Sequence, residues 1–134
     1  MPGIQKTTLL ISAQPGLWRN ALESYLKAKP ELEIHAIGQD LGELFTSLQD
    51  RRYDMLLMET VLNKDALRKV MARLQTEQAG LVSIIVCDTP DQYQTVESAG
   101  SCYAAMRLML QTRFEEILDS SRSKGRESAT HSKQ

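Results

Sequence analysis

The segment YDMLLMET, residues 53–60, is a short apolar run that Asp54 opens and Glu59 closes. A run of this length with polar residues at both ends predicts a strand that is buried on both faces, as strands are in a parallel sheet. Glu59 would then emerge at the edge of the sheet where that strand ends. The sequence therefore raises the question of what a carboxylate does at this edge.

Strands and helices alternate on both sides of this segment. Further strands are predicted at 7–13 (TTLLISA), 31–38 (ELEIHAIG), 81–87 (LVSIIVC) and 101–108 (SCYAAMRL). Apolar residues at helical spacing predict five helices. The first runs from Leu17 to before Pro30, the second follows Asp40, and the third includes Leu67 to Leu74. The fourth ends at Gly100, and the fifth covers 109–121. Each predicted strand is thus followed by one helix.

Two of the helix starts carry capping signals. Asp40 followed by Glu43 resembles a capping box, in which the two side chains bond to the free amide groups of the first turn. Thr89 is a predicted N-cap, Pro90 occupies the first helical position, and Gln92 is the capping partner. These signals fix where the second and fourth helices begin.

Five strand–helix units predict an α/β fold, a three-layer sandwich around a five-stranded parallel sheet with five helices. Right-handed crossovers require this arrangement because they place helices on both faces of the sheet. Residues 1–120 would form the single domain. Residues 121–134, SRSKGRESATHSKQ, are polar and basic without apolar periodicity, which predicts a flexible tail or linker.

Composition excludes several classes of protein. The chain has 134 residues with 42% hydrophobic side chains and a formal net charge of −1, so no overall charge attracts nucleic acid or anionic membrane. No apolar run is long enough to span a bilayer and no signal peptide is recognisable, so we expect a cytoplasmic protein. Cys87 and Cys102 lack metal-site spacing, and we expect no metal or cofactor.

The predicted strand ends also lack the residues of common enzyme sites. The loop SAQPG after the first strand has no glycine-rich phosphate-binding pattern. The two histidines are His35, inside a predicted strand, and His131, in the tail, and neither is placed to act in a catalytic triad. We therefore expect no catalytic residues and no enzyme activity.

The chain from about Thr7 to Leu118 resembles the receiver domain of bacterial two-component response regulators, of the type found ahead of a helix-turn-helix DNA-binding domain. The residues that carry the resemblance are LWRNALESYLKAKPELEIHAIG (17–38), YDMLLME (53–59) and ESAGSCYAAMR (97–107). The resemblance implies a flavodoxin-like sheet with strand order 2-1-3-4-5. It also implies a role in signal transduction or transcription regulation.

The chemical signature of that family is altered in this chain. Receiver domains end the first strand with an acidic pair that binds magnesium, and the matching positions here are Ala13 and Gln14. Magnesium requires anionic oxygen ligands, so this site is degenerate. The resemblance therefore implies a pseudo-receiver that is not controlled by phosphorylation.

The remaining family positions are also substituted. Glu59 matches the aspartate that accepts the phosphoryl group, Arg107 matches the phosphate-binding lysine, and Asp88, followed by Thr89, matches the switch hydroxyl. One hypothesis is that Glu59 pairs with Arg107 and holds the domain in one signalling state without phosphate. The alternative is that Glu59 is a solvated carboxylate at a strand end.

The resemblance implies that the domain works through protein contacts, with a partner protein or as a homodimer. The implied surface is the face made by the fourth helix, the fifth strand and the fifth helix. Its candidate contact residues are Tyr93, Tyr103, Met109, Arg113 and Phe114.

Two other functions remain open. A small flavodoxin-like ligand-binding protein or enzyme would use the crevice at the carboxyl ends of the strands. The basic residues RSKGR (122–126) of the tail suggest nucleic-acid binding only weakly, since no aromatic residue accompanies them. We expect contact with DNA only through an effector domain that lies outside this sequence, and no contact with a membrane.

Overall fold

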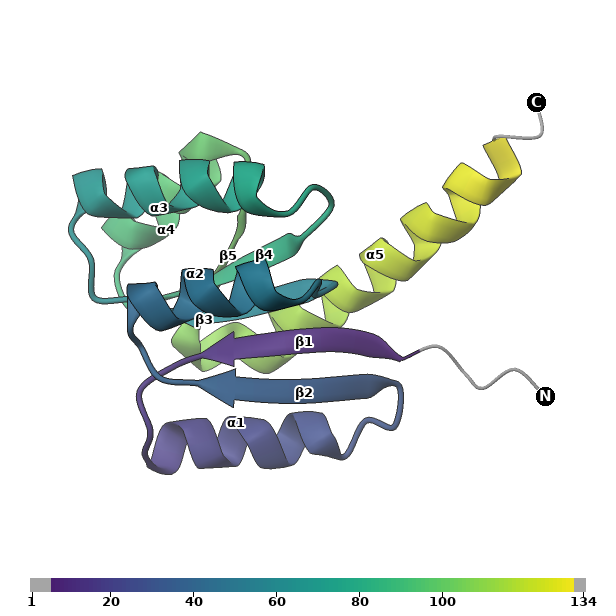
Figure 1. The fold of residues 1–134 in the computed structure, drawn as a ribbon, viewed down its shortest axis with the longest axis horizontal. Coiled ribbons are helices and arrows are strands. Elements are labelled where there is room, and N and C mark those ends of the chain that lie inside the picture. Colours follow the sequence, from purple (N-terminus) through teal and green to yellow (C-terminus); the bar gives the residue numbers. More distant parts are fainter. Residues whose placement is uncertain (1–5, 132–134) are drawn as a thin grey trace.

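The computed structural model describes residues 6–131 of the 134-residue chain, with side chains up to Ser121. Its centre is a parallel sheet of five strands in the order β2-β1-β3-β4-β5 (Figure 1). The strands are β1 (Thr7–Ser12), β2 (Leu32–Ile37), β3 (Met55–Glu59), β4 (Val82–Cys87) and β5 (Tyr103–Met106). The helices are α1 (Leu17–Lys27), α2 (Leu41–Asp50), α3 (Lys64–Glu77), α4 (Pro90–Ala99) and α5 (Leu110–His131), with a 3-10 turn η1 (Arg107–Met109) before α5. The predicted fold and strand order are confirmed.

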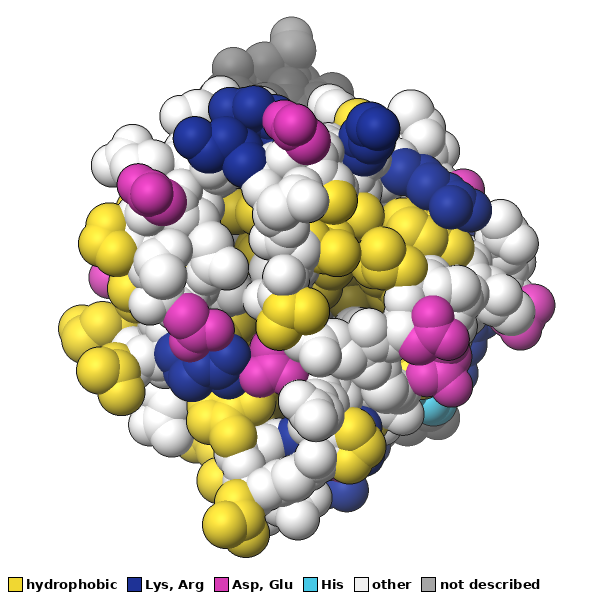
Figure 2. Space-filling model, turned by 90° about the vertical axis from the view of Figure 1, so that its left-hand side faces the viewer, with side chains coloured by type: hydrophobic (Ala, Val, Ile, Leu, Met, Phe, Trp, Pro, Cys, Tyr) yellow, Lys and Arg dark blue, Asp and Glu magenta, His cyan; other side chains and the backbone are white. Residues whose placement is uncertain are grey.

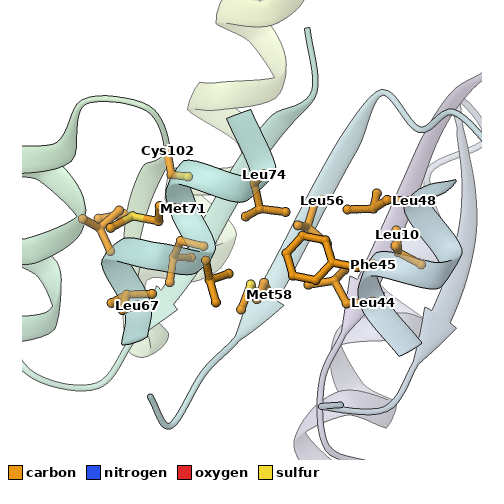
Figure 3. Close-up of a cluster of buried hydrophobic side chains, with 14 of the residues drawn as sticks. Leu10, Leu44, Phe45, Leu48, Leu56, Met58, Leu67, Met71, Leu74 and Cys102 are labelled. Carbon is orange, nitrogen blue, oxygen red and sulfur yellow. The ribbon is translucent and has the colours of Figure 1, made fainter. Parts of the chain in front are cut away.

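The apolar residues of the strands form two hydrophobic layers, one on each face of the sheet. Successive residues of a strand point to opposite faces, so β3 contributes Leu56 and Met58 to one layer and Met55 and Leu57 to the other. Helices α2, α3 and α4 cover the first layer, and α1 and α5 cover the second. Figure 3 shows the first layer, with Phe45 of α2 beside Leu56. Full burial of each such side chain stabilises the fold by about 1.5–3 kcal/mol.

The start of α2 differs in one contact from the capping box that the sequence predicts. The Asp40 carboxylate caps the helix as expected, because its Oδ1 accepts from the amide of Gly42 at 3.0 Å. The Glu43 carboxylate instead accepts from the amide of Gly38, at 2.8 Å. Glu43 therefore ties the helix to the end of β2 rather than to its own N-cap.

The start of α4 follows the sequence prediction more closely. The Thr89 hydroxyl accepts from the amide of Gln92 at 3.1 Å, and the Gln92 side chain accepts from the amide of Asp88 at 2.7 Å. Pro90 occupies the first turn, and the helix stops at Gly100, whose φ of 73° is left-handed. The Thr89 hydroxyl is thus used to cap a helix.

The fifth strand is shorter than the predicted segment 101–108. It ends at Met106, and the chain then turns through η1 before α5 begins at Leu110. This turn directs Leu108 and Met109 into solvent instead of along the sheet. The strand is short because only four of its residues pair with β4.

Helix α5 is longer than the sequence predicts. Its backbone continues to His131, through most of the segment 121–134 that we assigned to a flexible tail or linker. A helix that is already formed extends at little cost per residue, so apolar periodicity is not needed for such an extension. Over residues 6–131, no helix has the length and apolar character needed to cross a membrane.

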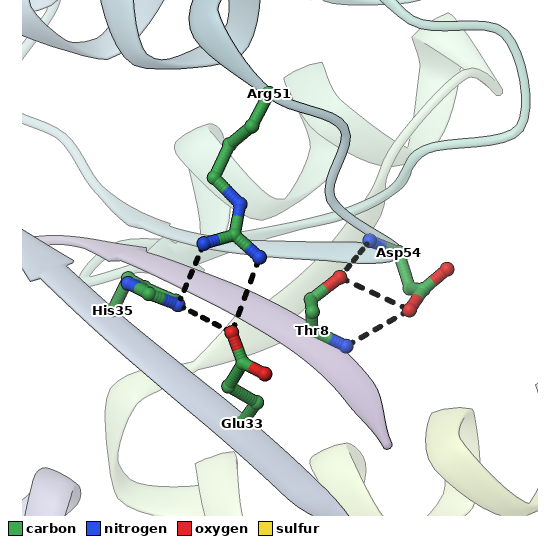
Figure 4. A network of polar contacts seen from close by, with 5 residues as sticks. All are labelled: Thr8, Glu33, His35, Arg51 and Asp54. Carbon is green, nitrogen blue, oxygen red and sulfur yellow. Dashed lines mark hydrogen bonds and ion pairs between the residues drawn. The ribbon is translucent and has the colours of Figure 1, made fainter. Parts of the chain in front are cut away.

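Polar contacts join the elements at the amino-terminal edge of the sheet (Figure 4). Asp54 Oδ2 accepts from the amide and the hydroxyl of Thr8, at 2.8 and 3.1 Å, which links β1 to the start of β3. Beside this link, Glu33 Oε2 lies 2.7 Å from His35 Nε2 and 3.1 Å from an Arg51 nitrogen. We refer to Glu33, His35 and Arg51 as the amino-edge cluster.

A buried amide holds the chain between α2 and β3 in place. The Gln78 side chain donates to the carbonyls of Leu48 and Arg51, both at 2.7 Å, and accepts from the amide of Tyr53 at 2.9 Å. Gln78 is among the few buried polar residues, so these bonds satisfy groups that water does not reach.

Candidate functional site

The carboxyl ends of β3, β4 and β5 bring three charged residues together. Glu59 is the last residue of β3, Asp88 follows β4 and Arg107 follows β5. The strands are parallel and in register, with Glu59 paired to Val86 and Cys87 paired to Met106, so their ends lie side by side. The two carboxylates and the guanidinium form what we call the carboxyl-edge cluster.

The Arg107 guanidinium binds both carboxylates of this cluster at once. Its Nη1 donates to Glu59 Oε2 at 2.7 Å. Its Nε and Nη2 donate to the two oxygens of Asp88, at 2.6 and 2.9 Å, which is a bidentate pair. The pairing of Glu59 with Arg107 that we considered from the sequence is therefore present, whereas a freely solvated Glu59 is not.

Two further groups complete the surroundings of the cluster. The amide of Gln14, in the loop after β1, donates to Glu59 Oε1 at 2.9 Å. Arg19 fixes this loop, since its Nη1 donates to the carbonyls of Ala13 and Ile37 at 3.1 and 3.2 Å. Ala13 itself is fully buried, so its methyl group belongs to the core.

The side chain of Trp18 lies against Arg107. The guanidinium carbon is 4.3 Å from the centroid of the indole ring, within the range of a cation–π contact. Sequence reasoning missed this residue. The available signal was a tryptophan at the second position of the helix that follows β1, where an aromatic ring reaches the edge of the sheet.

The charges of the cluster stabilise one another. The hydrogen bonds from Arg107 hold the pKa of Asp88 below its usual value, and the bonds to Asp88 and Glu59 raise the pKa of Arg107 further above neutrality. The side chains of Glu59 and Arg107 are 13% and 25% exposed, so solvent screens their pair less than it screens a surface pair. Asp88 and Arg107 are therefore both charged near neutral pH.

The residues at this edge do not fit a magnesium site. The Ala13 side chain offers no ligand, and the Gln14 amide already occupies one of the two Glu59 oxygens that a metal ion would need. Both remaining carboxylates already bind a guanidinium. Within residues 6–121, no three His, Cys, Asp or Glu side chains are grouped to hold a metal ion.

The predicted contact residues of the α4–β5–α5 face are not equally accessible. Phe114 is 1% exposed and packs in the core under α5, so its assignment to a surface patch was wrong. Tyr93 and Tyr103 are half-buried, and Met109 is exposed. Arg113 stacks on Tyr103 and its Nε donates to the carbonyl of Ala104 at 3.1 Å, so it also covers the free edge of β5.

Exposed apolar side chains gather at the carboxyl edge of the sheet. Figure 2 looks onto this edge and shows apolar patches around adjacent acidic and basic side chains. The large exposed apolar residues of the described chain are Leu17, Val61, Leu108 and Met109, which follow β1, β3 and β5. Helical spacing placed Leu17 on the buried face of its helix, but this first residue projects beyond the end of the sheet.

Comparison with models of known protein families gives no match for this chain, and comparison with curated protein sequences gives none. Solved structures do match. The RcsB response regulator of Salmonella typhimurium superposes with a TM-score of 0.72 at 10% identity, over 88% of this chain and 62% of the RcsB chain. The present chain thus spans less than two thirds of that protein.

A second similar structure is the receiver domain of the sensor histidine kinase PA1611 from Pseudomonas aeruginosa, which was solved with magnesium in its active-site cleft. Its TM-score is 0.61 at 16% identity, over 83% of this chain and 96% of that domain. At such low identities the likeness establishes the fold alone. The chain therefore has a receiver-like fold, and its function has to be argued from its own residues.

Proposed function

We propose that this chain is a pseudo-receiver, a receiver-like domain that acts in signal transduction through protein contacts and without phosphorylation. One observation carries the proposal: Arg107 binds Glu59 and Asp88 together, at the ends of three neighbouring strands. A guanidinium–carboxylate pair that needs no phosphoryl group then occupies the position that the resemblance assigns to the phosphorylation site. The domain would remain in one signalling state.

The chemistry of the site supports this proposal. Transfer of a phosphoryl group to a carboxylate requires a metal ion and a free cation to neutralise the developing charge. Here the cation, Arg107, is already paired with two carboxylates, and the acidic pair is replaced by Ala13 and Gln14. Glu59 therefore lacks the groups that would make it a phosphoryl acceptor.

Mass spectrometry tests the proposal. Incubation of the protein with magnesium and acetyl phosphate should leave its mass unchanged, while a phosphorylatable receiver treated in parallel gains one phosphoryl group. The variant Glu59→Asp should also remain unmodified, because it restores the acceptor but not the metal ligands. Stable phosphorylation of wild-type Glu59 would contradict the proposal.

The proposed contact surface is the α4–β5–α5 face, on which a second copy or a related receiver-like domain would bind. Phe114 is excluded from this surface, which leaves Tyr93, Tyr103 and Met109 as its apolar part. Sedimentation over a wide concentration range should detect a weak homodimer that Met109→Glu abolishes. If Leu17→Glu abolishes it instead, the interface lies at α1, and a monomer at all concentrations would remove self-association.

A ligand-binding protein or enzyme is the second candidate, and less supports it. The cavity beside Glu59 has a volume of only about 30 Å³, which holds a water molecule but no cofactor. A larger groove, of about 430 Å³, lies beside Trp18 and Arg107, but it has no glycine-rich phosphate loop or paired acid and base that would identify a ligand or reaction. Burial raises the pKa of Cys87 to about 11, so this thiol at the end of β4 is a poor nucleophile. Regulation of transcription would require an effector domain beyond this sequence.

A further inference from the structure

The groove beside Trp18 and Arg107 runs between α1 and the start of α5, on the face of the sheet that these two helices cover. It has a volume of about 430 Å³. Leu22 of α1 and Leu110 of α5 line the groove and are buried, so they form its floor. The residues of its walls are Trp18, Ala21, Leu108 and Thr112.

Apolar side chains at the rim of this groove are open to solvent. Leu108 of η1 is 97% exposed, and Leu17, the first residue of α1, is 89% exposed. Ala21 is also exposed, and the ring of Trp18 is half-buried against Arg107. Figure 2 shows such apolar side chains on this edge of the molecule. Leu108 therefore offers nearly its whole side chain to a partner, and its removal from water would favour binding.

The walls and floor of the groove present no unpaired charge. Among the described residues that line it, Arg107 alone is charged, and its guanidinium already binds Glu59 and Asp88. In α1, Arg19 lies 3.2 Å from the carboxylate of Glu23. The cores of protein interfaces are depleted of charge in the same way. A neutral surface can also face a copy of itself without repulsion between like charges.

We propose that this groove binds Leu108 of a second copy of the chain, in a symmetric contact made by α1 and η1 of both copies. One surface carries both a protruding leucine and a groove that can receive it. A contact about a two-fold axis requires this combination, because the same surface of each copy must fit the other. Ala21, a small exposed residue in the groove wall, allows the second copy to approach closely.

A second copy fits this surface better than other partners do. A charged segment or a nucleic acid would meet no unpaired charge along the groove. An anionic membrane would require free basic side chains around the apolar ones, and Arg19 and Arg107 are paired with carboxylates. A second copy instead places neutral groups opposite neutral groups, so no charge has to lose its hydration on binding.

This contact is separate from the proposed α4–β5–α5 contact and does not rest on the proposed function. Helix α4 packs on the opposite face of the sheet from α1. One leucine and one groove on each copy bury less than the roughly 1,200 Å² of a standard interface, so we expect a dissociation constant of about 1 mM. A chain with two separate self-contacts assembles beyond a dimer, and joining two copies through one contact strengthens the other. Assembly would then depend steeply on the concentration of the protein.

NMR spectra of the full chain in a dilution series test the proposal. Between about 2 mM and about 0.05 mM, amide signals of α1 and η1 should shift with concentration, because the contact forms over this range. Amide signals of α3, which lies on the opposite face of the sheet, should not shift. The spectra follow the α4–β5–α5 face in the same experiment, so the two contacts are measured separately.

Three variants locate the contact. Ala21→Arg should weaken it at least about tenfold, because the longer side chain fills the groove and places like charges opposite each other. Leu108→Ser should weaken it by a similar factor, because it removes the side chain that enters the groove. Ala72→Arg, the same change at an exposed alanine of α3, is the control and should have no effect. All three positions are exposed, so the melting temperature should stay close to that of the wild type.

Several results would overturn the proposal. If α1 and η1 do not shift at about 2 mM, the contact does not form. Shifts confined to α4 and β5 would leave the α4–β5–α5 contact standing and remove this one, and shifts confined to α1 and η1 would do the reverse. Shifts of α1 and η1 that survive both Ala21→Arg and Leu108→Ser would place the contact outside the groove. Binding of the wild type to phosphatidylglycerol vesicles that Leu108→Ser abolishes would assign the surface to a membrane instead.

Discussion

The two edges of the sheet carry similar groups in different surroundings. At each edge an arginine pairs with a carboxylate and lies over an aromatic ring: Arg107 with Glu59 and Trp18, and Arg51 with Glu33 and Tyr53. The amino-edge pair is 43% exposed on both sides, whereas Glu59 is 13% exposed. Residue types alone therefore do not distinguish a constrained ion pair from a surface one.

The origin of the partners explains the difference. The carboxyl-edge cluster collects side chains from the ends of three neighbouring strands and an amide from a fourth, so the sheet fixes each of them. In the amino-edge cluster, Glu33 and His35 both come from β2, the outermost strand, and Arg51 follows the last turn of α2. Exposed pairs of that kind contribute little to stability because solvent screens them and the side chains remain mobile.

We expect the largest loss of stability from a change at the amino edge, where the buried side-chain amide of Gln78, and not the ion pair, maintains the structure. Gln78→Ala leaves the carbonyls of Leu48 and Arg51 and the amide of Tyr53 without partners. We expect the free energy of unfolding to fall by about 3 kcal/mol in urea titrations. The control Gln49→Ala, which removes one exposed bond to Glu77, should change it by less than about 0.5 kcal/mol. Equal losses would contradict this assignment.

The second prediction compares the two arginines directly. Arg107→Met leaves Glu59 and Asp88 unpaired beside each other, and we expect a loss of about 2 kcal/mol, between the values for exposed and buried pairs. Arg51→Met keeps the aliphatic contact with Tyr53 and loses only an exposed pair, so its effect on the urea midpoint should be much smaller. If Arg51→Met proves the more damaging variant, the comparison of the two edges is wrong.

The sequence predicted the fold well because the fold depends on apolar periodicity. The five strands and the caps Asp40 and Thr89 follow from local patterns, whereas the order of the sheet was implied by the resemblance to receiver domains. The exposure of Leu17 does not follow from them, since periodicity identifies an apolar face but not where the neighbouring layer ends. The wrong assignment of Phe114 to the contact surface came from the resemblance, because helical spacing alone puts Phe114 on the apolar face of its helix.

The candidate site was predicted only in part. The resemblance to receiver domains indicated the pairing of Glu59 with Arg107, because it aligned the ends of two strands. The contacts from Trp18 and from the Gln14 amide depend on the path of the loop after β1, for which the sequence has no specific signal. The helical extension of α5 was missed because polar residues reveal little about backbone structure.

The third prediction concerns acid sensitivity. Hydrogen bonds from Arg107 lower the pKa of Asp88 in the folded state, so this carboxylate stabilises the fold above its unfolded pKa and loses that contribution as the pH falls through its folded value. Urea titrations below about pH 4 should therefore show a steeper loss for the wild type than for Asp88→Asn.

The amino edge supplies the control for this acid effect. Hydrogen bonds with His35 and Arg51 lower the pKa of Glu33 as well, so its contribution to stability is also lost as the pH falls. The two carboxylates are similarly exposed, Glu33 at 43% and Asp88 at 46%, so about 0.5 M salt should weaken both contributions. Because Arg107 binds Asp88 through two parallel hydrogen bonds, more of the Asp88 contribution should persist. If Asp88→Asn and Glu33→Gln lose stability identically as the pH falls at high salt, the carboxyl-edge cluster is no more constrained than the amino-edge cluster.

The smallest expected effect is spectroscopic and leaves the fold unchanged. Trp18 is the only tryptophan in the chain, so its fluorescence reports the carboxyl edge alone. Arg107→Met removes the guanidinium from the indole face and should shift the emission, whereas Arg51→Met should leave it unchanged. An emission spectrum that Arg107→Met leaves unchanged would mean that the guanidinium does not lie on the indole ring.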